Sequence, residues 1–108
     1  MNYKNNFFHV ENVSTEKLYK KFKTPLYCYS YTRIKKNITN FKNHFKKINP
    51  LICFSVKSNS NVKILKEIKN LGCGADVVSK GEIMKALKAG INTKKIVSGE
   101  KNLLSTSF

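Results

Sequence analysis

The sequence predicts an α/β fold in which short strands alternate with helices and form a parallel sheet. Three observations support this prediction. β-prone runs begin near positions 26, 51, 75 and 95, and apolar residues recur at helical spacing between these runs. Residues 51–56 also form an apolar run typical of strands that are covered on both faces. Repeating strand–helix units build either an open doubly wound sheet or the first part of a (β/α)8 barrel, and both architectures remain open at this point.

The chain is short and strongly basic. Its 108 residues allow one small domain and exclude a catalytic domain beside a separate cofactor domain. No apolar run approaches about 18 residues, the length of a membrane span, and residues 1–8 are too polar for a signal peptide. We therefore expect a cytoplasmic protein without membrane contact.

The 21 Lys and Arg include one arginine, Arg33. The excess of Lys, together with many Asn and Ile, is more typical of a genome with AT-rich codons than of a nucleic-acid binder. Nucleic-acid sites favour arginines interleaved with aromatic residues.

The cysteines give no sign of a disulfide framework or a metal site. Cys28, Cys53 and Cys73 are odd in number and form no Cys-x-x-Cys pair. We interpret them as three buried, reduced thiols, and we expect no bound metal.

The first half of the chain is expected to hold a polar leader, a short strand and a long helix. The leader covers residues 1–23 and contains one short helix over Ser14–Phe22. Thr24-Pro25 opens a β-prone run over Leu26–Tyr29, because proline suits the start of a strand. A helix is predicted from Tyr31 up to Asn49-Pro50, since one apolar stripe joins Ile34, Ile38, Phe41, Phe45 and Ile48.

The second half is expected to alternate strands and helices. Strands are predicted at 51–56, 75–78 and 95–98, and helices at 61–71 and 79–89. Gly72 and Gly90 are the expected C-terminal stops of the two helices. Ser79 and Glu82 form a capping-box pattern at the start of the second helix, whose inward face is predicted to carry Ile83, Met84 and Leu87.

Lys57 is the residue best suited to carry chemistry. Alternation along the strand places Phe54 and Val56 on one face, and Cys53, Ser55 and Lys57 on the other. The C-terminal end of a buried parallel strand is where α/β proteins place their active sites. A desolvated amine there can attack a carbonyl and form an imine. The alternative is that Lys57 simply extends from the strand end into solvent.

The segment around Lys57 resembles that of a known family, the fold-type-III pyridoxal-phosphate-dependent decarboxylases. Residues 54–59, Phe-Ser-Val-Lys-Ser-Asn, resemble the family segment in which a lysine follows an aromatic and two further residues and precedes a small residue and Asn. Residues 24–30 and 72–82 resemble the family's opening segment and its next strand and helix start. The resemblance covers about residues 24–98 and is greatest to the members that act on diaminopimelate. Residues 99–108 are then a divergent, truncated tail.

The resemblance implies a fold, a cofactor and three site residues. The fold is an incomplete (β/α)8 barrel of about three to four βα units, which in the whole family precedes a β-rich domain and forms a homodimer. The cofactor is pyridoxal 5'-phosphate, and Lys57 is the residue that forms the imine with it. Asp76 and Glu82 match acidic residues on the family's following strand and helix, and the resemblance assigns them to the cofactor site. Asp76 would hold the charge of the Lys57 amine, or it is a plain strand-end acid. Glu82 has the alternative of being only a helix cap.

The resemblance also implies a reaction. It is the decarboxylation of an amino acid. The expected substrate is meso-diaminopimelate, which would give lysine and carbon dioxide in lysine biosynthesis, and ornithine and arginine are the alternative substrates. Later parts of the family pattern are missing from these 108 residues, so we expect the chain to be inactive by itself. Two other classes stay open. One is a non-catalytic remnant of a degraded gene, and the weaker one is a basic nucleic-acid binder.

Overall fold

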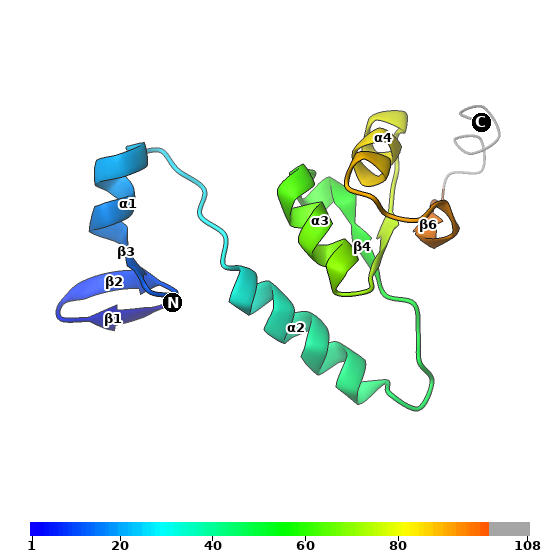
Figure 1. Ribbon diagram of the computed structural model, residues 1–108, viewed down its shortest axis with the longest axis horizontal. Coiled ribbons are helices and arrows are strands. Elements are labelled where there is room, and N and C mark those ends of the chain that lie inside the picture. The colour runs from blue at the N-terminus through cyan, green and yellow to red at the C-terminus, as the bar shows by residue number, and fades with distance from the viewer. Residues whose placement is uncertain (100–108) are drawn as a thin grey trace. The chain divides into compact units, whose positions relative to one another are not determined.

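The computed structural model describes residues 1–99 (Figure 1). The chain divides into two compact units, Met1–Asn37 and Ile38–Phe108. Within residues 1–99 no helix is long and apolar enough to cross a membrane.

The first unit opens with a small antiparallel sheet that the sequence did not predict. Its strands are β1 (Asn2–Lys4), β2 (Phe7–Val10) and β3 (Val13–Ser14), in the order β1-β2-β3. Asn5 and Asn6 make the β1–β2 turn at φ values of 52° and 69°, a left-handed conformation that asparagine tolerates better than most residues. The interpretation of residues 1–23 as a leader with one helix was therefore incomplete.

Helix α1 (Thr15–Phe22) confirms the short helix predicted in this region. The Ser14 hydroxyl caps it by accepting a hydrogen bond from the Lys17 N–H at 3.2 Å. Glu16 and Lys20 form an ion pair of 3.1 Å on its surface.

The strand predicted over residues 26–29 is wrong. Residues 26–30 carry no strand in the structure, and Tyr27 is 87% exposed. The run has β-forming side chains, but no neighbouring strand in the described part of the chain pairs with it. β propensity reports how well a residue fits a paired, half-buried surface, so it does not create a strand where a partner is lacking.

Helix α2 (Tyr31–His44) begins where predicted and ends earlier. Its first turn is capped twice, because the Ser30 hydroxyl accepts from the Arg33 N–H at 3.2 Å and Glu11 Oε1 accepts from the Thr32 N–H at 2.8 Å. At the other end, the Ile48 and Asn49 N–H groups both donate to the Phe45 carbonyl. These turns replace the last part of the predicted helix.

The second unit contains the predicted parallel sheet. Strands β4 (Cys53–Ser55), β5 (Gly74–Asp76) and β6 (Ile96–Val97) pair in chain order, and Ser55, Asp76 and Val97 lie side by side. Helix α3 (Val62–Asn70) connects β4 to β5, and helix α4 (Lys80–Lys88) with the 3-10 turn η2 (Thr93–Lys95) connects β5 to β6. This confirms an α/β fold, with strands shorter than predicted.

Both helices end at the predicted glycines. Gly72 and Gly90 have φ values of 83° and 90°, which residues with a Cβ rarely adopt. The Cys73 N–H donates to the Ile68 carbonyl at 3.2 Å and the Ile91 N–H to the Ala86 carbonyl at 3.1 Å. These bonds form the six-residue closure typical of a helix that ends in a left-handed residue.

The core lies on the face of the sheet that α3 and α4 cover (Figure 1). Phe54 packs partly against it and Val56 is fully buried. Both residues were predicted on the core face, but Val56 lies in a 3-10 turn after β4 rather than in the strand. The buried members of this cluster are Val56, Leu65, Ala75, Val77, Ile83, Ala86, Ala89 and Ile91.

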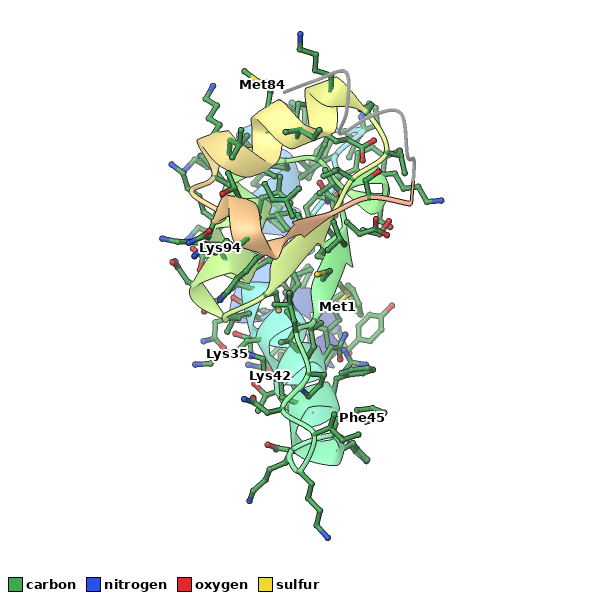
Figure 2. The ribbon with its side chains drawn as sticks, turned by 90° about the vertical axis from the view of Figure 1, so that its right-hand side faces the viewer. Met1, Lys35, Lys42, Phe45, Met84 and Lys94 are labelled. Carbon is green, nitrogen blue, oxygen red and sulfur yellow. The ribbon has the colours of Figure 1, made fainter. Side chains whose placement is uncertain are left out.

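The predicted inward face of α4 needs correction. Ile83 is 2% exposed, but Met84 is 58% exposed and points away from the rest of the unit (Figure 2). Leu87 is 36% exposed, whereas Ala86 is fully buried. Ile83, Ala86 and Ala89 recur every three residues and are buried members of the core cluster, so the helix turns this side inward rather than Met84 and Leu87.

Gly74 leads to a stability prediction. A Cβ at Gly74 would overlap the Lys95 carbonyl oxygen and contact the Cys53 sulfur, whereas at Gly81 the nearest atom lies 3.9 Å away. Gly74→Ala should therefore lower the free energy of unfolding by about 1–3 kcal/mol, as overpacking does. Gly81→Ala, the matched control in α4, should raise it by up to about 1 kcal/mol through helix propensity. Urea unfolding of the 108-residue chain measures both, and a Gly74→Ala variant as stable as Gly81→Ala would refute the close approach of Gly74 to Lys95.

Glu11 leads to a pH prediction for the first unit. Hydrogen bonds from Thr32 and Ser30 lower the pKa of Glu11 below its ordinary value of 4.5. The contribution of these bonds should be complete above pH 4.5 and disappear as the pH falls through the lower pKa of the folded state. The Thr32 amide signal in an NMR titration should follow this change. Glu11→Gln should abolish it and Glu16→Gln should not; a midpoint at or above 4.5 would contradict the hydrogen bonds.

Candidate functional site

Lys57 lies in the one-turn 3-10 helix η1 (Val56–Ser58), which directly follows β4. Val56 is fully buried, so the backbone before Lys57 is anchored in the core. The side chain of Lys57 itself is exposed. Its predicted place at a strand end is confirmed, but the predicted desolvation of its amine is wrong for this structure, because no element within residues 1–99 covers it.

A hollow of about 310 Å³ opens beside Lys57. Its walls come from two segments that are far apart in the sequence, namely η1 with the loop after it and the first turns of α4. The lining residues are Val56, Lys57, Ser60, Ser79, Gly81, Glu82 and Lys85. The residues around the hollow therefore carry two amines, two hydroxyls and one carboxylate.

Glu82 borders this hollow and also caps α4. The Ser79 hydroxyl accepts from the Glu82 N–H at 3.2 Å, as the capping-box pattern predicted. The returning bond differs in its partner, since Glu82 Oε1 accepts from the N–H of Val78 at 3.2 Å rather than from Ser79. Glu82 therefore fixes the start of α4 and places a carboxylate in the same hollow as Lys57.

Asp76 lies at the end of β5, beside Ser55 in the parallel register. It does not line the hollow. Within residues 1–99 the ion pair between Lys20 and Glu16 is the only one, so Asp76 and Lys57 are not paired. The nearby group that Asp76 affects is Cys53: burial raises the pKa of the Cys53 thiol, and the Asp76 carboxylate raises it further.

The interpretation of the cysteines as three buried thiols is wrong for two of them. Cys28 is exposed, Cys53 is half-buried and Cys73 is buried. Burial is the main cause that raises the pKa of Cys73. Among the residues that the structure describes, no three His, Cys, Asp or Glu side chains gather as a metal site would require.

Ser60 and Lys85 are residues of the hollow that the sequence analysis missed. The Lys85 amine donates a hydrogen bond of 3.1 Å to the Ser60 hydroxyl. Lys85 follows Glu82 by three positions in α4, a spacing that places two side chains on the same side of a helix. This spacing could have identified Lys85 once Glu82 was a candidate, whereas nothing in the sequence pairs it with Ser60.

The thiols give a prediction about reactivity. Because a raised pKa leaves less thiolate at about pH 8, Cys73 should react with iodoacetamide about tenfold more slowly than exposed Cys28, and Cys53 should lie between them. Mass spectrometry of peptides from the native chain measures the three rates. The same reaction in denaturant is the control, in which the rates should converge. Equal rates for Cys28 and Cys73 in the native chain would contradict the described burial.

Comparison with known proteins places this geometry in a family. Residues 31–103 match the sequence model described as "Pyridoxal-dependent decarboxylase, pyridoxal binding domain". The chain is 51% identical over 82 residues to diaminopimelate decarboxylase of Helicobacter pylori strain J99, covering 76% of this chain and 20% of that enzyme. It thus spans about a fifth of the length of that curated relative.

Solved structures agree with the sequence match. Diaminopimelate decarboxylase of M. jannaschii in complex with L-lysine superposes with a TM-score of 0.86 at 34% identity, over 90% of this chain and 24% of that one. The Helicobacter pylori enzyme with L-lysine gives a TM-score of 0.73 at 46% identity, over 78% of this chain and 21% of that one. The chain therefore belongs to the family of pyridoxal-dependent decarboxylases and corresponds to part of their pyridoxal-binding domain.

Proposed function

We propose that this chain supplies the lysine that holds pyridoxal 5'-phosphate in an amino-acid decarboxylase, and that Lys57 is this residue. One observation carries the proposal. In a chain of the pyridoxal-binding family, the exposed amine of Lys57 stands at the carboxyl end of a parallel strand and borders a hollow of about 310 Å³. This is the edge of a parallel sheet at which ligands of α/β proteins bind.

The sheet supports an incomplete (β/α)8 barrel as the architecture. Its strands are parallel and adjacent in chain order, and its helices cover one face, as in consecutive units of such a barrel. The other face carries the small side chains Cys53, Ser55 and Gly74 together with Asp76. We assign this second face to the barrel interior and residues 24–98 to the barrel domain. The homodimer and the cytoplasmic location stay predictions from the sequence.

The relatives support diaminopimelate as the substrate. Those quoted above are diaminopimelate decarboxylases, and two of their structures hold L-lysine. We propose that the whole protein converts meso-diaminopimelate to lysine and carbon dioxide. Because this chain spans about a fifth of such an enzyme, its own contribution is the lysine and the walls around it.

The donor set of the hollow fits the cofactor, since a free primary amine is the group that an aldehyde requires. When bound, pyridoxal phosphate supplies an electron sink for the electron pair that remains as carbon dioxide leaves. Lys57 would hold it covalently. Val56, buried beneath, fixes the position of the Lys57 backbone, and Ser79 with Glu82 fixes the first turn of α4. We also propose that the Glu82 carboxylate, which borders the hollow, belongs to the cofactor site. The assignment of Asp76 to that site stays a prediction from the sequence.

The proposal predicts selective modification of Lys57. The 108-residue chain is incubated with pyridoxal phosphate, reduced with borohydride and mapped by peptide mass spectrometry. Among 20 lysines, Lys57 should carry at least about three times the average label, because contacts in the hollow favour attachment there by an amount typical of one or two hydrogen bonds.

Two variants control this labelling experiment. Lys57→Arg keeps the charge and removes the nucleophile, so the label on the peptide spanning Leu51 to Lys63 should fall to the background of Lys63. Lys63→Arg, an exposed residue of α3, should leave the label on Lys57 unchanged. If Lys57 carried no more label than the average lysine of the wild-type chain, the assignment of Lys57 as the cofactor lysine would be refuted.

A further inference from the structure

The loop that follows Lys57 has few anchors of its own. Val56 and Leu65 are both fully buried, but no residue from 57 to 64 is buried. The Asn59 N–H donates to the Val56 carbonyl at 3.0 Å, and the Asn61 N–H donates to Asn59 Oδ1 at 3.0 Å. These bonds shape the loop locally and reach no other part of the fold. At the far end of the loop Val62 packs partly against the core, so a contact from a neighbouring element to residues 57–61 would fix the part of the loop that forms a wall of the hollow.

One side-chain hydrogen bond makes this connection. The Lys85 amine donates to the Ser60 hydroxyl at 3.1 Å, and both residues line the hollow beside Lys57. Within the described residues, no other side-chain hydrogen bond joins residues 57–63 to the rest of the chain. Because Ser60 is three residues from Lys57, this bond acts on the segment that presents the reactive amine.

Lys85 belongs to a helix that the core holds in place. Ile83 and Ala86, on either side of it in α4, are 2% and 0% exposed, so the helix cannot rotate without disturbing the core. The start of α4 is held by the Ser79 cap and by the bond from the Val78 N–H to Glu82. The Lys85 side chain therefore extends from a fixed helix to a loop that lacks buried residues.

We propose that Lys85 is a positioning residue for Lys57. Through Ser60 it fixes the loop after η1 and keeps the wall of the hollow in the geometry in which the Lys57 amine meets an aldehyde. This inference rests on the proposed function of Lys57 and adds to it. The alternative role of Lys85 is direct contact with the phosphate of the ligand. Labelling with and without that phosphate distinguishes the two roles.

Hydrogen exchange tests the connection without any ligand. In the full 108-residue chain, the amides of residues 57–61 should exchange about threefold faster in Lys85→Gln and in Ser60→Ala, the change expected for loss of one modest hydrogen bond. The double variant should exchange no faster than either single variant, because both remove the same bond. Lys85→Arg should restore much of the protection. Lys88→Gln, an exposed lysine of the same helix that does not line the hollow, should have no effect.

Labelling of Lys57 tests the positioning role. Each variant is treated with pyridoxal phosphate or with pyridoxal, which lacks the phosphate, and then reduced with borohydride under conditions in which circular dichroism shows native signal. Positioning predicts that Lys85→Gln and Ser60→Ala lower the label on Lys57, relative to the average lysine, by about threefold with both aldehydes. Lys88→Gln should leave the ratio unchanged, and Lys85→Arg should recover it.

The outcomes separate this inference from the function on which it rests. A loss confined to pyridoxal phosphate would show that Lys85 contacts the phosphate directly and would overturn the positioning role. Preferential labelling of Lys57 that is unchanged in Lys85→Gln, or unchanged exchange of residues 57–61, would overturn the inference and leave the role of Lys57 intact. Absence of any preference for Lys57 in the wild-type chain would overturn both.

Discussion

Burial of one face of the β4–β5–β6 sheet beneath α3 and α4 is the interaction on which the candidate site depends. The Gly74 N–H donates to the Ile52 carbonyl at 2.8 Å and the Val77 N–H to the Val97 carbonyl at 2.9 Å. These bonds fix the parallel register, so that the carboxyl ends of the strands lie at one edge of the sheet. Lys57 follows the end of β4 at this edge, and α4 begins after the end of β5 at the same edge. The register therefore brings η1 and the start of α4 together, and the loop after η1 completes the wall of the hollow between them.

The features that could be predicted from the sequence are those that depend on neighbours along the chain. Gly72 and Gly90 end their helices because only a left-handed residue closes the last turn there. Ser79 caps α4 because its hydroxyl meets an N–H three residues on. The alternation of residues 51–57 correctly places Phe54 and Val56 toward the core, although the strand ends at Ser55 and a 3-10 turn carries Val56 and Lys57. Each of these features depends only on residues within one turn of a helix or one strand.

The features that could not be predicted depend on what lies across space. Residues 26–29 are β-prone, but pairing decides whether a strand forms, and the described chain offers no partner. The strands β1 to β3 are only two to four residues long, too short for an alternation pattern to stand out. The exposure of Lys57 depends on what covers the strand end, and the Lys85–Ser60 bond depends on the packing of α4 beside η1. No local pattern contains this information.

Amide hydrogen exchange at Gly74 and Val77 is the most direct test of the parallel register on which the candidate site depends. Gly74 begins β5 and Val77 follows it, and β5 is paired on both sides with Ala75 fully buried. The Gly74 and Val77 amides should exchange at least about 100-fold more slowly than those of residues 26–30, which pair with no strand in the described chain. Equal exchange in the two segments would mean that the sheet does not hold its register. The geometry proposed around Lys57 would then have no foundation.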